Sequence, residues 1–125
     1  MARPSMTLSG VVLDSPDAQE LSGFYRRLLG WDARDDDPDW VVLQAPDGGV
    51  NLSFQSEPGY VRPVWPSGSE QQMMVHLDIQ VDDLDAAVAW ATECGATLAD
   101  FQPQDDVRVM LDPAGHPFCL FRSDS

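Results

Sequence analysis

The sequence contains no lysine, and its seven basic residues are all arginines. The 21 acidic residues outnumber them, so that the formal net charge is −14. Binding to nucleic acid requires clustered basic side chains that neutralise phosphates, and we therefore expect no nucleic-acid partner. The same charge should repel anionic molecules and attract cationic ones, although an acidic surface also serves solubility alone.

Signals of cellular location are scarce as well. Cys94 and Cys119 are the only cysteines, too few for a disulfide framework. No apolar run approaches the roughly 20 residues that cross a bilayer, and residues 1–10 lack the apolar core of a secretory signal. We therefore expect a soluble, cytoplasmic protein with no membrane partner. Its 125 residues suit a single domain, residues 1–125.

The first half of the chain predicts one helix among four strands. "LSGVVL" (8–13) reads as a strand, and "DSPD" offers Asp14 or Ser15 as the N-cap of a helix that ends at Gly30. Between these residues the apolar positions recur with a helical period of 3.6 residues. Strands are then predicted within residues 31–36, 39–45 and 50–56.

The second half repeats this order. A strand within 74–81 leads into an Asp-capped helix within 82–94, and strands follow within 97–101, 107–112 and 118–122. Adding 66 to the number of Asp17 gives Asp83, and other landmarks keep this offset within one residue. A repeat of this kind determines the fold prediction: module one at about 7–56, a Pro-rich linker at about 57–72, and module two at about 73–123.

Three stretches carry a resemblance to a known family: "FYRRLLGW" (24–31), "HLDIQVDDLDAAV" (76–88) and "LDPAGHPFCLF" (111–121). Together with the repeat, they resemble the vicinal oxygen chelate superfamily of glyoxalases, bleomycin-resistance proteins and extradiol dioxygenases. The resemblance implies an α+β fold, in which two tandem βαβββ modules form a curved, incompletely closed mixed β-sheet around a cleft. It also implies a homodimer.

The resemblance also implies where a metal would bind. In metal-dependent members, His, Glu or Gln side chains on the first and last strand of each module hold a divalent ion, which acts as a Lewis acid on the substrate. The first-strand positions here are Gly10 and His76, and the last-strand positions are Cys119 and either Leu52 or Ser53. His76 alone is a usual ligand. We therefore expect a degenerate metal site and no metal cofactor.

A smaller set of ligands nevertheless stays open. Asp78 lies two residues after His76 and should project from the same strand face, so that these two residues and Cys119 form a conceivable donor set. His76 is then a metal ligand, a catalytic base or a residue that lines the cleft wall. It is the best catalytic candidate in the sequence, and we interpret it as a pocket residue.

Small-molecule pockets combine apolar and aromatic walls with a few polar groups. Trp40 at a strand start and Trp65 in the linker are candidates for such walls, and Arg108 could pair with an acid or with a ligand. The residues predicted to line the cleft are His76, Asp78, Trp40, Trp65, Phe54, Arg108 and Cys119.

Three functions are compatible with these features. The first is the binding of a small molecule, with sequestration of a cationic or aromatic compound as the role. The second is a metal-dependent lyase, isomerase or dioxygenase with atypical ligands, or a metal-free enzyme with His76 as base. The third is an accessory module. The sequence leaves open whether the protein is an enzyme.

Overall fold

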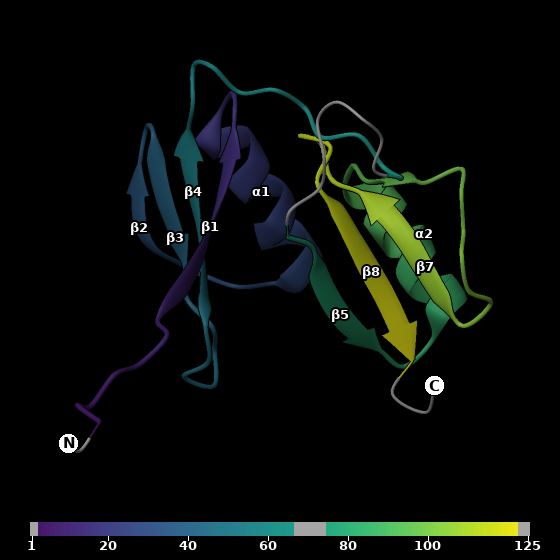
Figure 1. Ribbon diagram of the computed structural model, residues 1–125, viewed down its shortest axis with the longest axis horizontal. Coiled ribbons are helices and arrows are strands. Elements are labelled where there is room, and N and C mark those ends of the chain that lie inside the picture. The colour runs from purple at the N-terminus through teal and green to yellow at the C-terminus, as the bar shows by residue number, and fades with distance from the viewer. Residues whose placement is uncertain (1–2, 67–74, 123–125) are drawn as a thin grey trace. The chain divides into compact units, whose positions relative to one another are not determined.

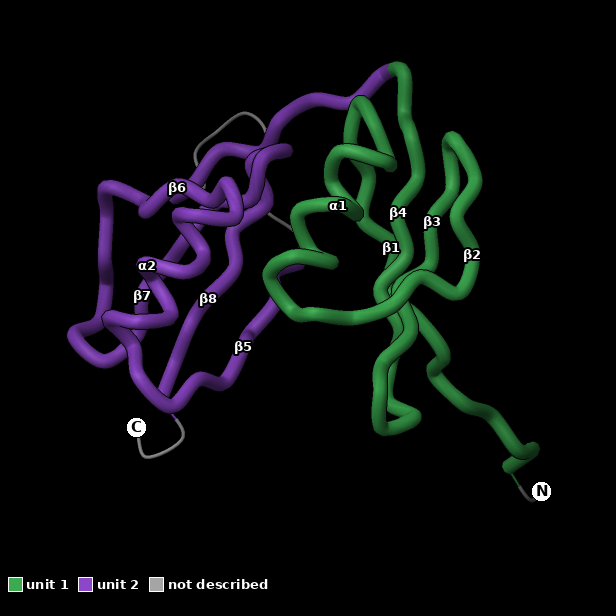
Figure 2. The backbone as a smooth tube through the Cα atoms, turned by 180° about the vertical axis from the view of Figure 1, so that it is seen from behind, with its two compact units in different colours: residues 1–58 green, residues 59–125 purple. Residues whose placement is uncertain are grey.

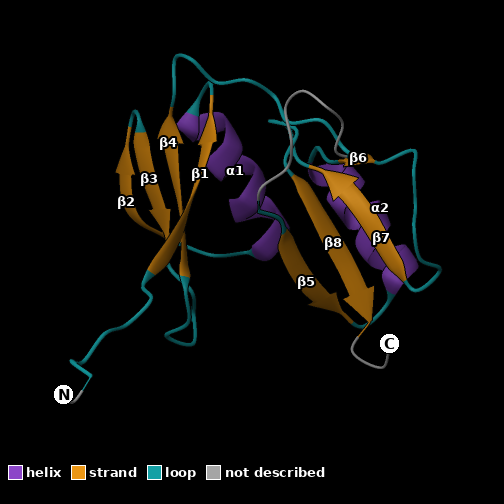
Figure 3. Cartoon of the chain, in the orientation of Figure 1, coloured by secondary structure: helices purple, strands orange, loops and turns teal. Residues whose placement is uncertain are grey.

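The chain folds as two compact units, residues 1–58 and 59–125, which contain module one and module two (Figure 2). The computed structural model describes residues 3–66 and 75–122 (Figure 1). Each unit contains a four-stranded mixed sheet, not closed into a barrel, and one α-helix (Figure 3). The predicted α+β class with two tandem modules is therefore confirmed. The predicted linker lies partly outside the described residues.

Module one has the strand order β1-β4-β3-β2. The edge strand β1 pairs in parallel with β4, whereas β3 is antiparallel to both of its neighbours. The helix α1 contacts β1, β3 and β4, so that it covers one face of this sheet (Figure 1). The elements are β1 (Gly10–Ser15), α1 (Ala18–Leu29), β2 (Ala33–Asp37), β3 (Trp40–Leu43) and β4 (Asn51–Ser56).

Module two repeats this topology with the order β5-β8-β7-β6. Its first and last strands, β5 and β8, are again parallel, and α2 contacts β6, β7 and β8. The strand predicted within 97–101 has only two residues in β6. The elements are β5 (Leu77–Val81), α2 (Leu84–Cys94), β6 (Thr97–Leu98), β7 (Val107–Leu111) and β8 (Pro117–Arg122).

Equivalent aspartates begin the two helices. The Asp17 carboxylate accepts hydrogen bonds from the first-turn amides of α1, and the Asp83 carboxylate accepts one from the amide of Ala86 in α2. These bonds satisfy amides that have no partner inside the helix. The N-cap prediction of Asp14 or Ser15 is wrong, because both residues remain extended in β1 and pair with β4. The observed caps, Asp17 and Asp83, are related by the offset of 66.

Packing on the helix side holds module one together. Phe24, Tyr25 and Phe54 are completely buried, with the Phe24 and Tyr25 ring centroids 4.8 Å apart and the Tyr25 and Phe54 centroids 5.6 Å apart. Edge-to-face and offset contacts of this kind add to the free energy of burying the rings. The core of the unit therefore lies between α1 and the sheet.

A buried aspartate organises the turn before β8. The Asp112 carboxylate accepts hydrogen bonds from the amides of Ala114 and His116, and it lies 2.8 Å from His116 Nδ1. The Tyr60 hydroxyl donates to the Ala114 carbonyl oxygen. This network ties the start of the linker to module two. His116 is accordingly a turn residue with a buried partner.

Neither described helix has the length and apolar composition of a membrane-spanning segment.

The buried ring of Phe54 provides a stability test. Phe54→Ala should lower the free energy of unfolding by about 3–5 kcal/mol, because it leaves a cavity against Tyr25. Phe101→Ala should cost only about 1 kcal/mol, because the Phe101 side chain is 52% exposed and loses little beyond its edge contact with Trp65. Chemical denaturation followed by circular dichroism measures both changes. Equal losses would contradict this description of the core.

Candidate functional site

The sheet face of module one that points away from α1 contains a pocket of about 240 Å³. Side-chain alternation along β4 places Ser53 on this face, because Phe54 packs against α1. Trp40, 37% exposed, and Val12, 46% exposed, give the pocket aromatic and aliphatic walls. The lining residues are Ser9, Gly10, Val12, Arg34, Trp40, Val42, Asn51 and Ser53.

The pocket has one charged lining side chain. The Arg34 guanidinium lies 3.2 Å from the Asp35 carboxylate, so that its charge is balanced within β2. A register shift between Ala33 and Asp35 interrupts the pairing of β2 with β3 at this point. Such an irregularity changes the direction of a side chain, which accounts for an arginine beside Trp40. The pocket is therefore mainly neutral.

The corresponding strands of module two bring together His76, Asp78 and Cys119. His76 precedes β5, and its Nε2 atom lies 3.1 Å from Asp78 Oδ1. Asp78 pairs with Cys119 of β8 in the parallel register, which places their side chains on one face. One donor atom from each of the three residues lies within 4.8 Å of the others. The donor set that the sequence left open therefore exists as a cluster.

The surroundings of Cys119 favour its thiol form over the thiolate. Burial raises the pKa of the Cys119 thiol, and the negative charge of Asp78 and a hydrogen bond to its carboxylate raise this pKa further. The thiolate is the nucleophilic form of cysteine, so that a raised pKa lowers its reactivity at neutral pH. This environment therefore disfavours a role for Cys119 as a nucleophile.

The strand registers show which positions of the two modules are equivalent. Val12 pairs with Ser53 in module one and Asp78 pairs with Cys119 in module two, and both pairs are related by the offset of 66. Ser53, and not Leu52, is therefore the counterpart of Cys119. By the same offset, Gly10 is the counterpart of His76.

These equivalences test the metal site that the resemblance implies. The positions that carry His, Glu or Gln in metal-dependent members hold Gly10, Ser53, His76 and Cys119 here. Glycine has no donor atom, and a serine hydroxyl is a poor ligand beside an imidazole or a carboxylate. The residues of module one therefore do not fit the family's metal, and we assign no catalytic step to such an ion.

The remaining residues predicted for the cleft have other neighbours. Phe54 belongs to the core, because its ring is completely buried on the α1 side of β4, and its assignment to the cleft is corrected. Arg108 Nη1 donates to the carbonyl oxygens of Gln104, Asp105 and Val107, which stabilises the loop before β7. Trp65 makes an edge contact with Phe101 at a centroid distance of 5.8 Å.

Sequence reasoning missed most of the pocket of module one. Side-chain alternation places Val12 and Val42 on the pocket face once their strands and strand pairing are known. The sequence therefore contained a signal for these two lining residues. Arg34 could not be predicted as a lining residue from the sequence, because the direction of its side chain depends on the irregular pairing of β2. Trp40 is the one predicted cleft residue that lines this pocket.

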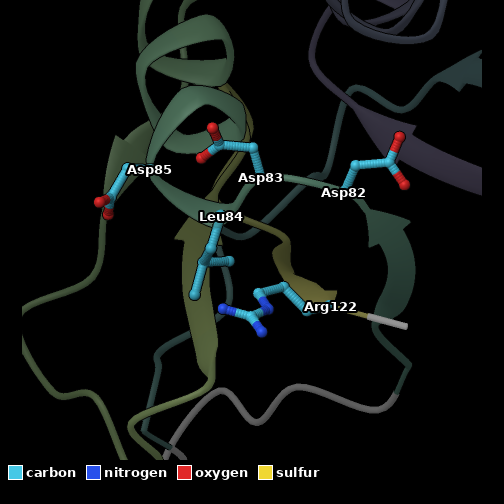
Figure 4. Close-up of a pocket in the computed structure, with 5 residues that line it drawn as sticks. All are labelled: Asp82, Asp83, Leu84, Asp85 and Arg122. Atoms are coloured by element: carbon cyan, nitrogen blue, oxygen red, sulfur yellow. The ribbon is translucent and has the colours of Figure 1, made fainter. Parts of the chain in front are cut away.

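A second hollow of about 410 Å³ lies where β5 meets α2 (Figure 4). The Asp83 carboxylate already caps α2, and in Figure 4 the carboxylates of Asp82, Asp83 and Asp85 point in different directions. Arg122 and Leu84 complete the lining. Because the acidic groups do not converge, this hollow lacks the geometry of a binding site.

Solved structures with the same fold include several glyoxalase-related proteins. A glyoxalase/bleomycin resistance protein/dioxygenase family enzyme from Burkholderia phytofirmans PsJN has a TM-score of 0.72 at 21% identity, with 94% of this chain and 98% of that chain covered. A glyoxalase family protein from Enterococcus faecalis has a TM-score of 0.68 at 20% identity, with 92% and 96% covered. A lactoylglutathione lyase from Agrobacterium tumefaciens has a TM-score of 0.63 at 15% identity, with 97% and 96% covered.

The match to a family model, together with this fold, identifies the chain as a member of the vicinal oxygen chelate superfamily. Residues 10–121 match the family model of the glyoxalase-like domain, and the chain belongs to that family. No curated protein shows significant sequence similarity to it. At the identities of the solved structures the likeness establishes the fold, and the function has to be argued from the site.

The raised pKa of Cys119 can be measured through its chemistry. In a Cys94→Ser background, alkylation of Cys119 by iodoacetamide at pH 7.5 should be slow and should accelerate as the pH rises. Asp78→Asn should increase the rate several-fold at pH 7.5, because it removes the charge that helps to raise the thiol pKa. Asp85→Asn, in the first turn of α2, is the matched control and should leave the rate unchanged. A rate that Asp78→Asn leaves unchanged or lowers would contradict this assignment.

Proposed function

We propose that the protein binds a small, partly aromatic molecule in the pocket of module one and that this binding needs no metal. The observation that carries the proposal is Gly10 at a position where metal-dependent relatives carry a ligand. An open pocket with Trp40 as a wall lies beside it. Pockets for small molecules have this combination of apolar walls and a few polar groups.

The size and charge of the pocket narrow the ligand class. A volume of about 240 Å³ lies just below the roughly 300 Å³ at which drug-sized pockets begin, which favours a small ring or one ring of a larger molecule. The net charge of −14 favours a neutral or cationic ligand over an anionic one. The positive charge of Arg34 repels a cationic ligand only weakly, because the Asp35 carboxylate balances it.

Sequestration is the role that these features support best. The similar structures include proteins named for bleomycin resistance, and the binding of a cationic drug in an acidic protein suits the charge of this chain. We further propose that the protein is a homodimer, as the resemblance to the superfamily implies, and that it is cytoplasmic, because two cysteines suit a reducing compartment. Sedimentation of the purified protein measures its oligomeric state.

An enzymatic function is the second candidate, and one observation favours it. His76, Asp78 and Cys119 could hold an ion as atypical ligands, or His76 could act as a base beside Asp78 without one. Turnover that is lost in His76→Ala but retained in Trp40→Ala would favour the enzyme over the binding protein.

A thermal-shift and calorimetric screen tests the proposed function. Aromatic cations and neutral aromatic compounds should raise the Tm by several degrees, because a ligand at 100 times its Kd stabilises the folded state by about 2.7 kcal/mol. Anionic analogues should have weaker effects. A screen in which divalent metals stabilise the protein and no organic compound does would contradict the proposal.

Two variants locate the binding in module one. Gly10→Leu should weaken binding at least about tenfold, since a Cβ at Gly10 has room beside Asn51 and Ser53 and the added side chain would fill the pocket. Trp40→Ala should weaken it similarly by removing the aromatic wall. Trp65→Ala, which changes a tryptophan of the linker that contacts Phe101, is the matched control and should retain the wild-type Kd.

A further inference from the structure

We infer that module two by itself holds a thiophilic divalent metal, Zn²⁺ or an ion of similar preference, through His76, Asp78 and Cys119. The family arrangement divides its ligands between two modules, whereas this set lies within one. Asp78 is the added ligand, at a position whose counterpart in module one is Val12. The inference goes beyond the proposed function, because it concerns a different module and a different ligand.

Strand pairing provides the geometry. The parallel register of β5 and β8 places Asp78 beside Cys119, and His76 lies two residues before Asp78 on the same face. These side chains converge although about forty residues separate the two strands in the sequence. The topology of the module brings these side chains together, because β5 and β8 would pair in the sheet whichever polar residues they carried.

The distances are close to those of a metal site. Donor atoms around a tetrahedral Zn²⁺ are separated by roughly 3.5 Å, given bonds of about 2.0 Å to nitrogen or oxygen and 2.3 Å to sulfur. His76 Nε2 and Asp78 Oδ1 are 3.1 Å apart, and all three donors lie within 4.8 Å of one another. The side chains of His76 and Asp78 are 40% and 61% exposed, so that small rotations can close the remaining gap.

The donor types select the ion. Imidazole and thiolate are ligands of Zn²⁺ and related transition metals, whereas Mg²⁺ and Ca²⁺ require more oxygen ligands than one carboxylate provides. Three protein ligands leave a fourth coordination position for water or an external donor. The site should therefore bind zinc with an exchangeable fourth ligand.

Cobalt provides a direct spectroscopic test, because a Co²⁺–thiolate bond produces near-ultraviolet charge-transfer absorption and tetrahedral Co²⁺ absorbs strongly in the visible range. Titration of the full-length, reduced protein with Co²⁺ should produce both signals at one ion per chain, and Zn²⁺ should displace the cobalt. Cys119→Ser should abolish the charge-transfer band. His76→Ala and Asp78→Asn should each weaken binding by about tenfold or more.

Matched controls separate this site from nonspecific binding. Cys94→Ser removes the other cysteine, which is buried in α2, and should retain the full signal. Gly10→Leu blocks the pocket of module one and should also leave cobalt binding unchanged, so that failure of the proposed function is distinguishable from failure of this inference. Circular dichroism checks the fold of each variant. The Asp78 side chain is exposed, so that Asp78→Asn changes the site without removing a core side chain.

Three results would overturn the inference: no stoichiometric binding, a charge-transfer band that survives Cys119→Ser, or equal affinity in wild type and Asp78→Asn.

Discussion

The parallel pairing of the first and last strand in each module is the interaction on which the rest of the structure depends. It joins β1 to β4 and β5 to β8, and it sets the register in which Val12 meets Ser53 and Asp78 meets Cys119. Because a parallel pair needs a long connection, the helix and the two intervening strands can be accommodated between its members. The helix covers one face of the sheet, so that the other face is available for ligands.

The two modules use this common scaffold differently. Module one has Gly10 and Ser53 on its pairing strands, and the space beside them is a pocket with a tryptophan wall. Module two has an imidazole, a carboxylate and a thiol at the equivalent positions, with one donor atom of each within 4.8 Å of the others. Different side chains on a shared register thus account for a pocket in one unit and a donor cluster in the other.

The sequence predicted the features that depend on local chemistry and on the repeat. Asp83 is a helix cap beside a clear helical period, and the alternation of β5 placed His76 and Asp78 on one exposed face. The assignment of Phe54 to the cleft overlooked the alternation of β4, in which Phe54 shares a face with Leu52 and lies opposite Ser53. The pocket around Arg34 depends on an irregular strand pairing that no local pattern reveals. Pairing between distant strands, and not propensity, decides these positions.

The central claim is that the two equivalent faces have diverged, with a metal site confined to module two. X-ray diffraction from crystals grown with Zn²⁺, recorded at wavelengths above and below the zinc absorption edge, tests this claim most directly. We predict one anomalous peak per chain, bonded to His76 Nε2, a carboxylate oxygen of Asp78 and Cys119 Sγ, with no peak beside Gly10 or Ser53. A zinc ion bound through residues of module one, or no ordered zinc beside Cys119, would contradict the account.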